Sequence, residues 1–252
     1  MTDTIRFSQQ GSIARLTLNH AERHNALGRE QLDAMEEIFA SLESGTDARV
    51  LVLDAVGDKT FCAGASLHEL SAGDMGDNAF QRMTARLAAL HVPTICAIGG
   101  NVFGGGVELA ASCDFRIVVE GIRMRVPAAS LGLCYPLEGI HRFVECVGVA
   151  ATRRILVASE TLHTADMQQM GFIDRLVTRE ALEREVDAFA QHIAGLAPLA
   201  VRSMNHILRQ ISTGNLDADQ AHDLVAATLE SADLQEGFAA QREKRAPQFR
   251  GV

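Results

Sequence analysis

The most informative stretch of this sequence is Asn101-Val102-Phe103-Gly104-Gly105-Gly106-Val107-Glu108-Leu109, in which three glycines lead into a helix-forming segment. An apolar, strand-like run, Thr94–Ile98, precedes it, and a second such run, Phe115–Val119, follows it. Strands and helices that alternate along the chain form sheets covered by helices. The stretch and its neighbours therefore predict an α/β fold.

Glycines at the start of a helix leave backbone N–H groups open to a ligand, and the helix dipole favours negative charge there. Such donors suit an oxygen on which charge develops during a reaction. Glu108 falls in the first helical turn, where a carboxylate could move protons on nearby carbons. Close helix packing and simple dipole pairing produce the same pattern, so both the catalytic and the structural interpretation stay open at this point.

The first half of the chain alternates between strand and helix patterns, with period-two or fully apolar runs for strands and three-to-four-residue periodicity for helices. The predicted elements are strands Ile5–Ser8, Ile13–Leu18 and Val50–Leu53, helices Arg29–Leu42 and Phe80–His91, and a loop of small residues at Gly57–Leu67.

Strand patterns nearly vanish after about residue 145, where Ile173–Val177 is the exception. The predicted helices are Ala150–Ala158, Ala165–Met170, Glu180–Gly195, Pro198–Gln210 and Asp217–Glu243. We therefore expect an α/β core in residues 1–195 and a helical C-terminal region in residues 196–252.

The composition limits the possible functions of the protein. A net charge of −9 over 252 residues disfavours a nucleic-acid-binding protein, which needs a basic surface. No uncharged apolar run approaches the roughly 20 residues that span a bilayer. The five cysteines are odd in number and no secretory signal is visible, which favours a cytoplasmic protein with reduced thiols. The nine histidines form no metal-ligand cluster, so no metal is expected.

Four segments, taken in order, resemble the enoyl-CoA hydratase/isomerase (crotonase) family over nearly the whole chain. They are His24-Asn25-Ala26-Leu27, Phe61–Leu67, Gly104–Glu108 and the run from Thr164-Ala165-Asp166 to Gly171-Phe172-Ile173-Asp174. The resemblance implies a spiral of ββα units with C-terminal helices that form trimers, often stacked as hexamers. It implies a CoA thioester as substrate and no separate cofactor.

Positions that match the family's motifs imply roles for individual residues. The N–H groups of Ala65 and Gly105 would hold the thioester oxygen of an enolate, and Glu108 would act as acid/base. Backbone around Arg23, Ala26, Ala63 and Leu67 would bind the CoA moiety. His68 falls where some relatives contact a CoA phosphate, although a surface histidine is the simpler interpretation.

Two positions depart from the family's pattern. Ala128 stands where hydratases carry a second glutamate, which puts two-carboxylate hydration in doubt, and Ser66 replaces a loop aspartate. Tyr135, the only tyrosine, lies in a stretch that resembles methylmalonyl-CoA decarboxylase, and this favours a place in the acyl pocket. Glu138 is either a second catalytic acid or a dipole partner for a helix starting near Gly139.

Three functions stay open on this sequence. The leading one is an enoyl-CoA hydratase/isomerase-type reaction in which Glu108 moves protons. The second is decarboxylation or thioester hydrolysis at Tyr135, and the third is acyl-CoA binding without turnover.

Overall fold

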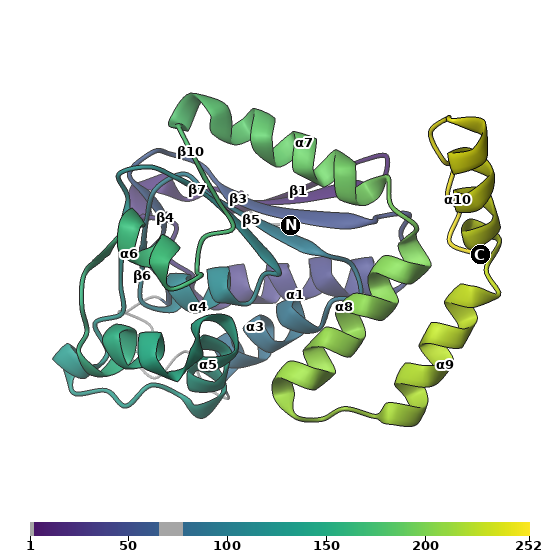
Figure 1. Ribbon diagram of the computed structural model, residues 1–252. Helices are drawn as coiled ribbons and strands as arrows, with labels where there is room; N and C mark the ends of the chain where they lie inside the picture. Colours follow the sequence, from purple (N-terminus) through teal and green to yellow (C-terminus); the bar gives the residue numbers. More distant parts are fainter. Residues whose placement is uncertain (1–2, 66–77) are drawn as a thin grey trace.

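Two β-sheets form the frame of the protein, and the computed structural model describes residues 3–65 and 78–252 (Figure 1). The first sheet has the strand order β1-β2-β3-β5-β7-β10. Its strands are β1 Ile5–Gln10, β2 Ile13–Leu18, β3 Val50–Ala55, β5 Thr94–Ile98, β7 Phe115–Val119 and β10 Arg175–Val177. Only β1 and β2 pair antiparallel; the other pairs are parallel.

The second sheet is smaller and has the order β4-β6-β8-β9. Its strands are β4 Thr60–Cys62, β6 Asn101–Phe103, β8 Arg123–Arg125 and β9 Leu162–His163. The chain passes three times from a strand of the first sheet to a strand of the second: β3 to β4, β5 to β6, and β7 to β8. The described helices that follow are α3 Ala79–Ala89, α4 Gly105–Ala111 and α5 Leu137–Thr152. Each passage moves one strand along both sheets, as the expected spiral of ββα units requires.

Helices cover both faces of the first sheet, so its central strands are buried on both sides. Val50 and Val52 of β3 pack with α7, Leu182–Ala194, on one face. Leu51 and Leu53 point to the other face and join the main core, which includes the apolar side of α1, Arg29–Glu43. This explains why β3 reads as a continuous apolar run rather than as an alternating one.

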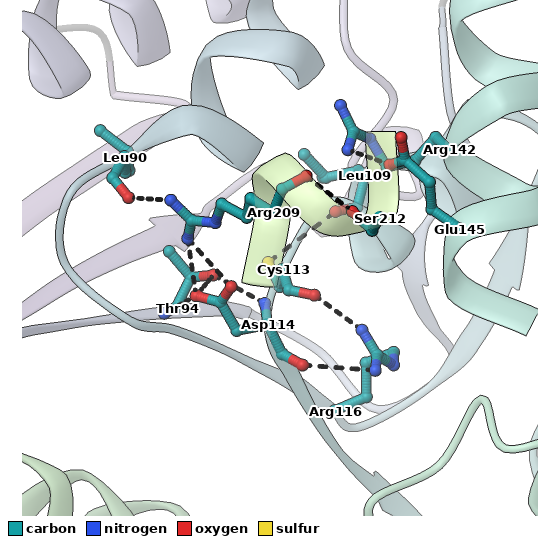
Figure 2. Close-up of polar contacts among 10 residues, drawn as sticks. All are labelled: Leu90, Thr94, Leu109, Cys113, Asp114, Arg116, Arg142, Glu145, Arg209 and Ser212. Atoms are coloured by element: carbon teal, nitrogen blue, oxygen red, sulfur yellow. Dashed lines mark hydrogen bonds and ion pairs between the residues drawn. The ribbon is translucent and has the colours of Figure 1, made fainter. Parts of the chain in front are cut away.

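The C-terminal region is helical: α8 Pro198–Thr213, α9 Ala218–Leu229 and α10 Ala232–Glu243. In Figure 1, α8 runs along the end of the core, while α9 and α10 stand apart from the sheets. Figure 2 shows how α8 is fastened: Arg209 donates two hydrogen bonds to Asp114, at 2.9 and 3.0 Å, and one to the carbonyl of Leu90. Asp114 in turn accepts from the N–H and hydroxyl of Thr94.

Three sequence expectations need correction. The predicted loop Gly57–Leu67 contains strand β4, which is too short to produce a periodic pattern. Ala150–Ala158 is not a separate helix: it joins the end of α5 to the π-helical turn Arg153–Val157. Asp217–Glu243 is two helices, because the Ser231 hydroxyl caps α10 by accepting from the N–H of Leu234 at 3.1 Å.

The boundary predicted between residues 195 and 196 falls in the turn between α7 and α8. The division into two regions stays a prediction. Among the described residues, no helix is both long and apolar enough to cross a bilayer.

Candidate active site

The N-terminus of α4 lies directly against the loop that follows β4. Gly64 has φ +87°, and a Cβ added there would lie 2.4 Å from the Gly105 nitrogen. A Cβ on Gly106 would lie 2.5 Å from the carbonyl oxygen of Cys62. Glycine is therefore needed at both positions, because any side chain would push the two segments apart. This contact places the chain just before Ala65 against the start of α4.

Two backbone N–H groups are left open at this junction. Gly105 is the first residue of α4, so its N–H has no partner within the helix. Within residues 3–65 and 78–252, neither this group nor the N–H of Ala65 donates a hydrogen bond. Two neighbouring donors at a helix N-terminus can hold an oxygen that carries negative charge.

The loop before α1 fixes the segment that carries Ala65. Asn25 is buried, and its side-chain amide donates to the carbonyls of Val56 and Thr60, both at 3.1 Å. The N–H of Ala63 donates to the carbonyl of His24, and Leu27 forms a parallel bridge with Ala65. His24 and Asn25 both have positive φ, which the Asn25 hydrogen bonds hold in place.

Glu108 lies one turn into α4 and is only 1% exposed. Its two carboxylate oxygens accept from hydroxyl groups of different elements. Oε1 accepts from Thr84 of α3 at 2.8 Å, and Oε2 accepts from Tyr135, just before α5, at 2.7 Å. The carboxylate is thereby held in one orientation, on a residue one helical turn from Gly105.

Burial is the main influence on the pKa of Glu108 and raises it from its ordinary value. The hydrogen bonds from Tyr135 and Thr84, and the positive charge of Arg142, oppose this shift, while the charge of Glu138 adds to it. A raised carboxyl pKa suits a group that takes up and returns a proton. Burial and the Glu108 charge raise the pKa of Tyr135 well above its usual value, so its hydroxyl stays a neutral donor.

An apolar hollow of about 400 Å³ lies beside Tyr135. Ala128, Ile140, Val144 and Leu156 contribute to its walls. Ala128 is buried and brings no polar group to this space. Tyr135 packs edge-on against Phe143, with ring centroids 5.6 Å apart.

Gly139 makes room for the hydrogen bond between Tyr135 and Glu108. A Cβ at this position would lie 2.3 Å from Cε1 of Tyr135 and 2.8 Å from Oε2 of Glu108. The first turn of α5 can therefore approach both side chains only because residue 139 has no side chain.

The structure brings most of the predicted site residues together. Ala63, Ala65, Gly105, Glu108 and Tyr135 lie around the junction of α4 with the β4 loop, while Leu67 lies outside the described residues. Ala26 is half-buried in the loop before α1 and donates to the carbonyl of Arg23 at 3.1 Å, while the Arg23 side chain is exposed.

Glu138 is exposed in the first turn of α5, and its carboxylate forms no hydrogen bond with any described residue. This placement fits a dipole partner for α5. A catalytic role for Glu138 stays a prediction. Among the described residues, no group of three His, Cys, Asp or Glu side chains gathers as metal ligands would.

Sequence reasoning missed Thr84. The sequence does contain one indication of a role for Thr84: this residue lies on the apolar face of α3 with Phe80, Met83 and Leu87, all of them buried. A hydroxyl on a buried helix face needs a hydrogen-bond partner. Which residue supplies that partner depends on tertiary packing, and the sequence does not contain it.

Comparison with known proteins bears on the family and fold of this chain. The model of the family "Enoyl-CoA hydratase/isomerase" matches residues 8–252. Enoyl-CoA hydratase domain-containing protein 2, mitochondrial, of Mus musculus is 31% identical and covers 95% of this chain and 84% of its own length. Carnitinyl-CoA dehydratase of Citrobacter koseri is 27% identical over the full length of both chains.

A solved structure described as an enoyl-CoA hydratase/carnithine racemase from Magnetospirillum magneticum superposes with a TM-score of 0.92. It is 27% identical, and the match covers 100% of this chain and 97% of that one. The match of the family model, the full-length relatives and the shared architecture lead to one conclusion: this chain belongs to the enoyl-CoA hydratase/isomerase family.

Proposed function

We propose that this protein transfers protons on an acyl-CoA thioester, with Glu108 as acid/base and the N–H groups of Ala65 and Gly105 holding the thioester oxygen. The observation that carries the proposal is the buried Glu108 carboxylate, held by two hydroxyls one turn from the open helix start. Charge that develops on the thioester oxygen as an enolate forms would be stabilised by these donors.

Double-bond isomerisation is the reaction that this site supports best. One base can remove a proton from one carbon and return it to another on the same face of the substrate, so no second acid is required. Hydration in relatives with two glutamates uses a second carboxylate, and this chain has Ala128 there, buried beside an apolar hollow. We therefore expect hydration to be slower than isomerisation. The proposal needs no cofactor beyond the CoA carried by the substrate.

The test compares isomerisation of a 3-enoyl-CoA with hydration of crotonyl-CoA in the wild type and in Glu108→Gln. Loss of a general acid/base lowers kcat by about 10²- to 10⁴-fold. Glu37→Gln, an exposed position on α1, is the matched control and is expected to keep full activity. Full activity in Glu108→Gln would contradict the assignment.

Glu138→Gln belongs in the same series. An unchanged rate would identify Glu138 as a dipole partner only, whereas a loss comparable to that of Glu108→Gln would make it a second catalytic acid. Because Glu138 is exposed, the substitution should leave the fold intact.

Decarboxylation or thioester hydrolysis at Tyr135 is the second candidate function. The position of Tyr135, between Glu108 and the apolar hollow, favours contact with an acyl group. Its hydroxyl proton is, however, already donated to Glu108, which argues against Tyr135 as an independent acid. Turnover of malonyl-type thioesters that is lost in Tyr135→Phe would bring this candidate forward.

Acyl-CoA binding without turnover is the third candidate. It would be supported if every thioester bound tightly and none reacted. The retained carboxylate beside two open N–H donors argues against it. A cytoplasmic location and assembly into trimers or hexamers remain proposals drawn from the sequence.

A further inference from the structure

The Thr84 hydroxyl has two acceptors within reach. Its side chain is 2% exposed, and Oγ1 lies 2.8 Å from Glu108 Oε1 and 3.1 Å from the carbonyl oxygen of Gln81. A hydroxyl carries one proton, so it can donate to only one of these oxygens at a time. Its own oxygen can accept a hydrogen bond in either case.

The two acceptors matter because Glu108 must exist in two protonation states during proton transfer. As a carboxylate, it accepts from Thr84 at Oε1 and from Tyr135 at Oε2. As a carboxylic acid protonated on Oε1, it can donate to Thr84 Oγ1, provided that the Thr84 proton turns to the Gln81 carbonyl. A proton on Oε2 would instead face the Tyr135 hydroxyl proton, which has no second acceptor among the described residues. With the proton on Oε1, no buried polar group loses its partner, and this avoids a cost of about 1–3 kcal/mol.

We propose that Thr84 is a positioning residue, whose hydroxyl turns between Glu108 Oε1 and the Gln81 carbonyl and so holds the Glu108 carboxyl group in both protonation states. Thr84 keeps its own proton throughout, and the proton taken from the substrate carbon returns to the substrate. The inference deepens the proposed function and rests on the role of Glu108 as acid/base.

Other groups around Glu108 do not duplicate this role. Tyr135 has no second acceptor for its hydroxyl among the described residues. Arg142 and Glu138 of α5 act on Glu108 through charge, and Arg142 is already paired with Glu145 at 2.8 Å. Cys62 of β4 packs against Gly106, and its thiol donates to the carbonyl of Asn25 at 3.2 Å. Among the described residues, Thr84 is the residue of α3 that hydrogen-bonds to Glu108.

The test uses Thr84→Val, which has nearly the same shape without the hydroxyl, and Thr84→Ser, which keeps the hydroxyl. Thr94→Val is the matched control, because the Thr94 hydroxyl also donates to a carboxylate, that of Asp114, at 2.9 Å. All three are compared with the wild type for isomerisation of a 3-enoyl-CoA across a range of pH.

We expect Thr84→Val to lower kcat about tenfold, the effect of one lost hydrogen bond in the transition state, with KM within about twofold. The acid limb of its kcat/KM profile should move to higher pH, because the lost bond favoured the ionised form of Glu108. Thr84→Ser should restore both values, and Thr94→Val should leave the profile in place. An unchanged profile in Thr84→Val, or a failure of Thr84→Ser to restore it, would overturn the proposal.

An infrared titration of the Glu108 carboxyl band, assigned by its loss in Glu108→Gln, needs no turnover. The band should titrate at higher pH in Thr84→Val than in Thr84→Ser. If no thioester reacted with the wild type, the proposed function would fail, whereas this titration would still decide whether Thr84 holds Glu108. Thr84→Ala carries the same expectation if the valine variant does not fold.

Discussion

Glu108 combines deep burial with an ionisable side chain, and this combination has a cost for stability. Burial raises the pKa of Glu108 in the folded protein above its ordinary value, so the folded state binds the proton more tightly than the unfolded chain does. The stability from this group is therefore fully present below the unfolded pKa. It is lost as the pH rises through the folded pKa. The site keeps a carboxylate where an uncharged group would be more stable.

Glu108→Gln should therefore be more stable than the wild type at pH 8, by about 0.5–2 kcal/mol, the range common for stabilising substitutions. The amide can keep contacts with both hydroxyls: its oxygen accepts from Tyr135, and its NH2 group donates to Thr84, whose proton turns to the Gln81 carbonyl. At pH 3, below the pKa of Glu108 in both the folded and the unfolded state, the difference should become small. Urea unfolding at the two pH values measures it. An equal difference at both pH values would contradict the interpretation, and Glu37→Gln is the control.

Single residues differ in how far the sequence could predict their roles. Glu108 and Gly105 could be placed because glycines and a carboxylate within one helical turn form a local pattern. Tyr135 was expected in the acyl pocket from a resemblance, but its bond to Glu108 joins residues 27 positions apart. Thr84 was missed for the same reason: its partner is 24 positions away and is fixed only by packing.

At the scale of elements, the position of α5 depends on the absence of a side chain at Gly139 in its first turn. Thr84 of α3 and Tyr135, just before α5, both donate hydrogen bonds to Glu108 of α4. Gly139 sets how closely α5 can approach these side chains. A residue with any side chain at position 139 would have to displace the Tyr135 ring.

Gly139→Ala is expected to lower isomerase kcat about 10- to 100-fold and to cost about 1–3 kcal/mol of stability, because overpacking must move Tyr135 away from Glu108. Steady-state kinetics and urea unfolding test this. Gly237→Ala in α10 is the matched control: its Cβ would lie 3.7 Å from Phe249, an ordinary contact. That variant should keep full activity and gain about 0.5–1 kcal/mol. Wild-type kinetics in Gly139→Ala would show that the Tyr135 position does not matter.

Elements were predicted well where periodicity is long and poorly where it is short. The helices Arg29–Leu42 and Pro198–Gln210 agree with α1 and α8 to within a few residues. The second sheet was largely missed because β4, β6 and β8 have three residues each. Strands of that length are defined by their neighbours, whereas their own sequence contains almost no pattern.

At the scale of the whole molecule, the C-terminal helices expose an apolar face. Met204, Leu208 and Ile211 of α8 are 59%, 63% and 55% exposed. Their spacing places them on one side of the helix, away from Arg209, which ties α8 to the core. Contiguous exposed apolar side chains mark surfaces that bind other protein. This supports the trimer or hexamer that the family resemblance implies.

Leu208→Glu should therefore lower the molar mass in solution from an oligomer towards a monomer, because a charge would have to be buried in the contact. Sedimentation equilibrium measures the mass. Thr213→Glu adds the same charge at an exposed position of α8 outside the apolar face and should leave the mass unchanged. A wild-type protein that is monomeric at every concentration would contradict the expectation.

The junction of Gly64 with Gly105 has a consequence for how this fold can change over evolution. The two donors proposed to hold the thioester oxygen belong to the backbone, so at Ala65 only a substitution by proline, which has no N–H, would delete one while the glycines preserve the contact. Under the proposed function, the groups that choose the reaction are side chains: Glu108, Ala128 and Tyr135. If the proposed function holds, substitutions of these side chains can change the reaction while the backbone donors that bind the oxygen stay the same.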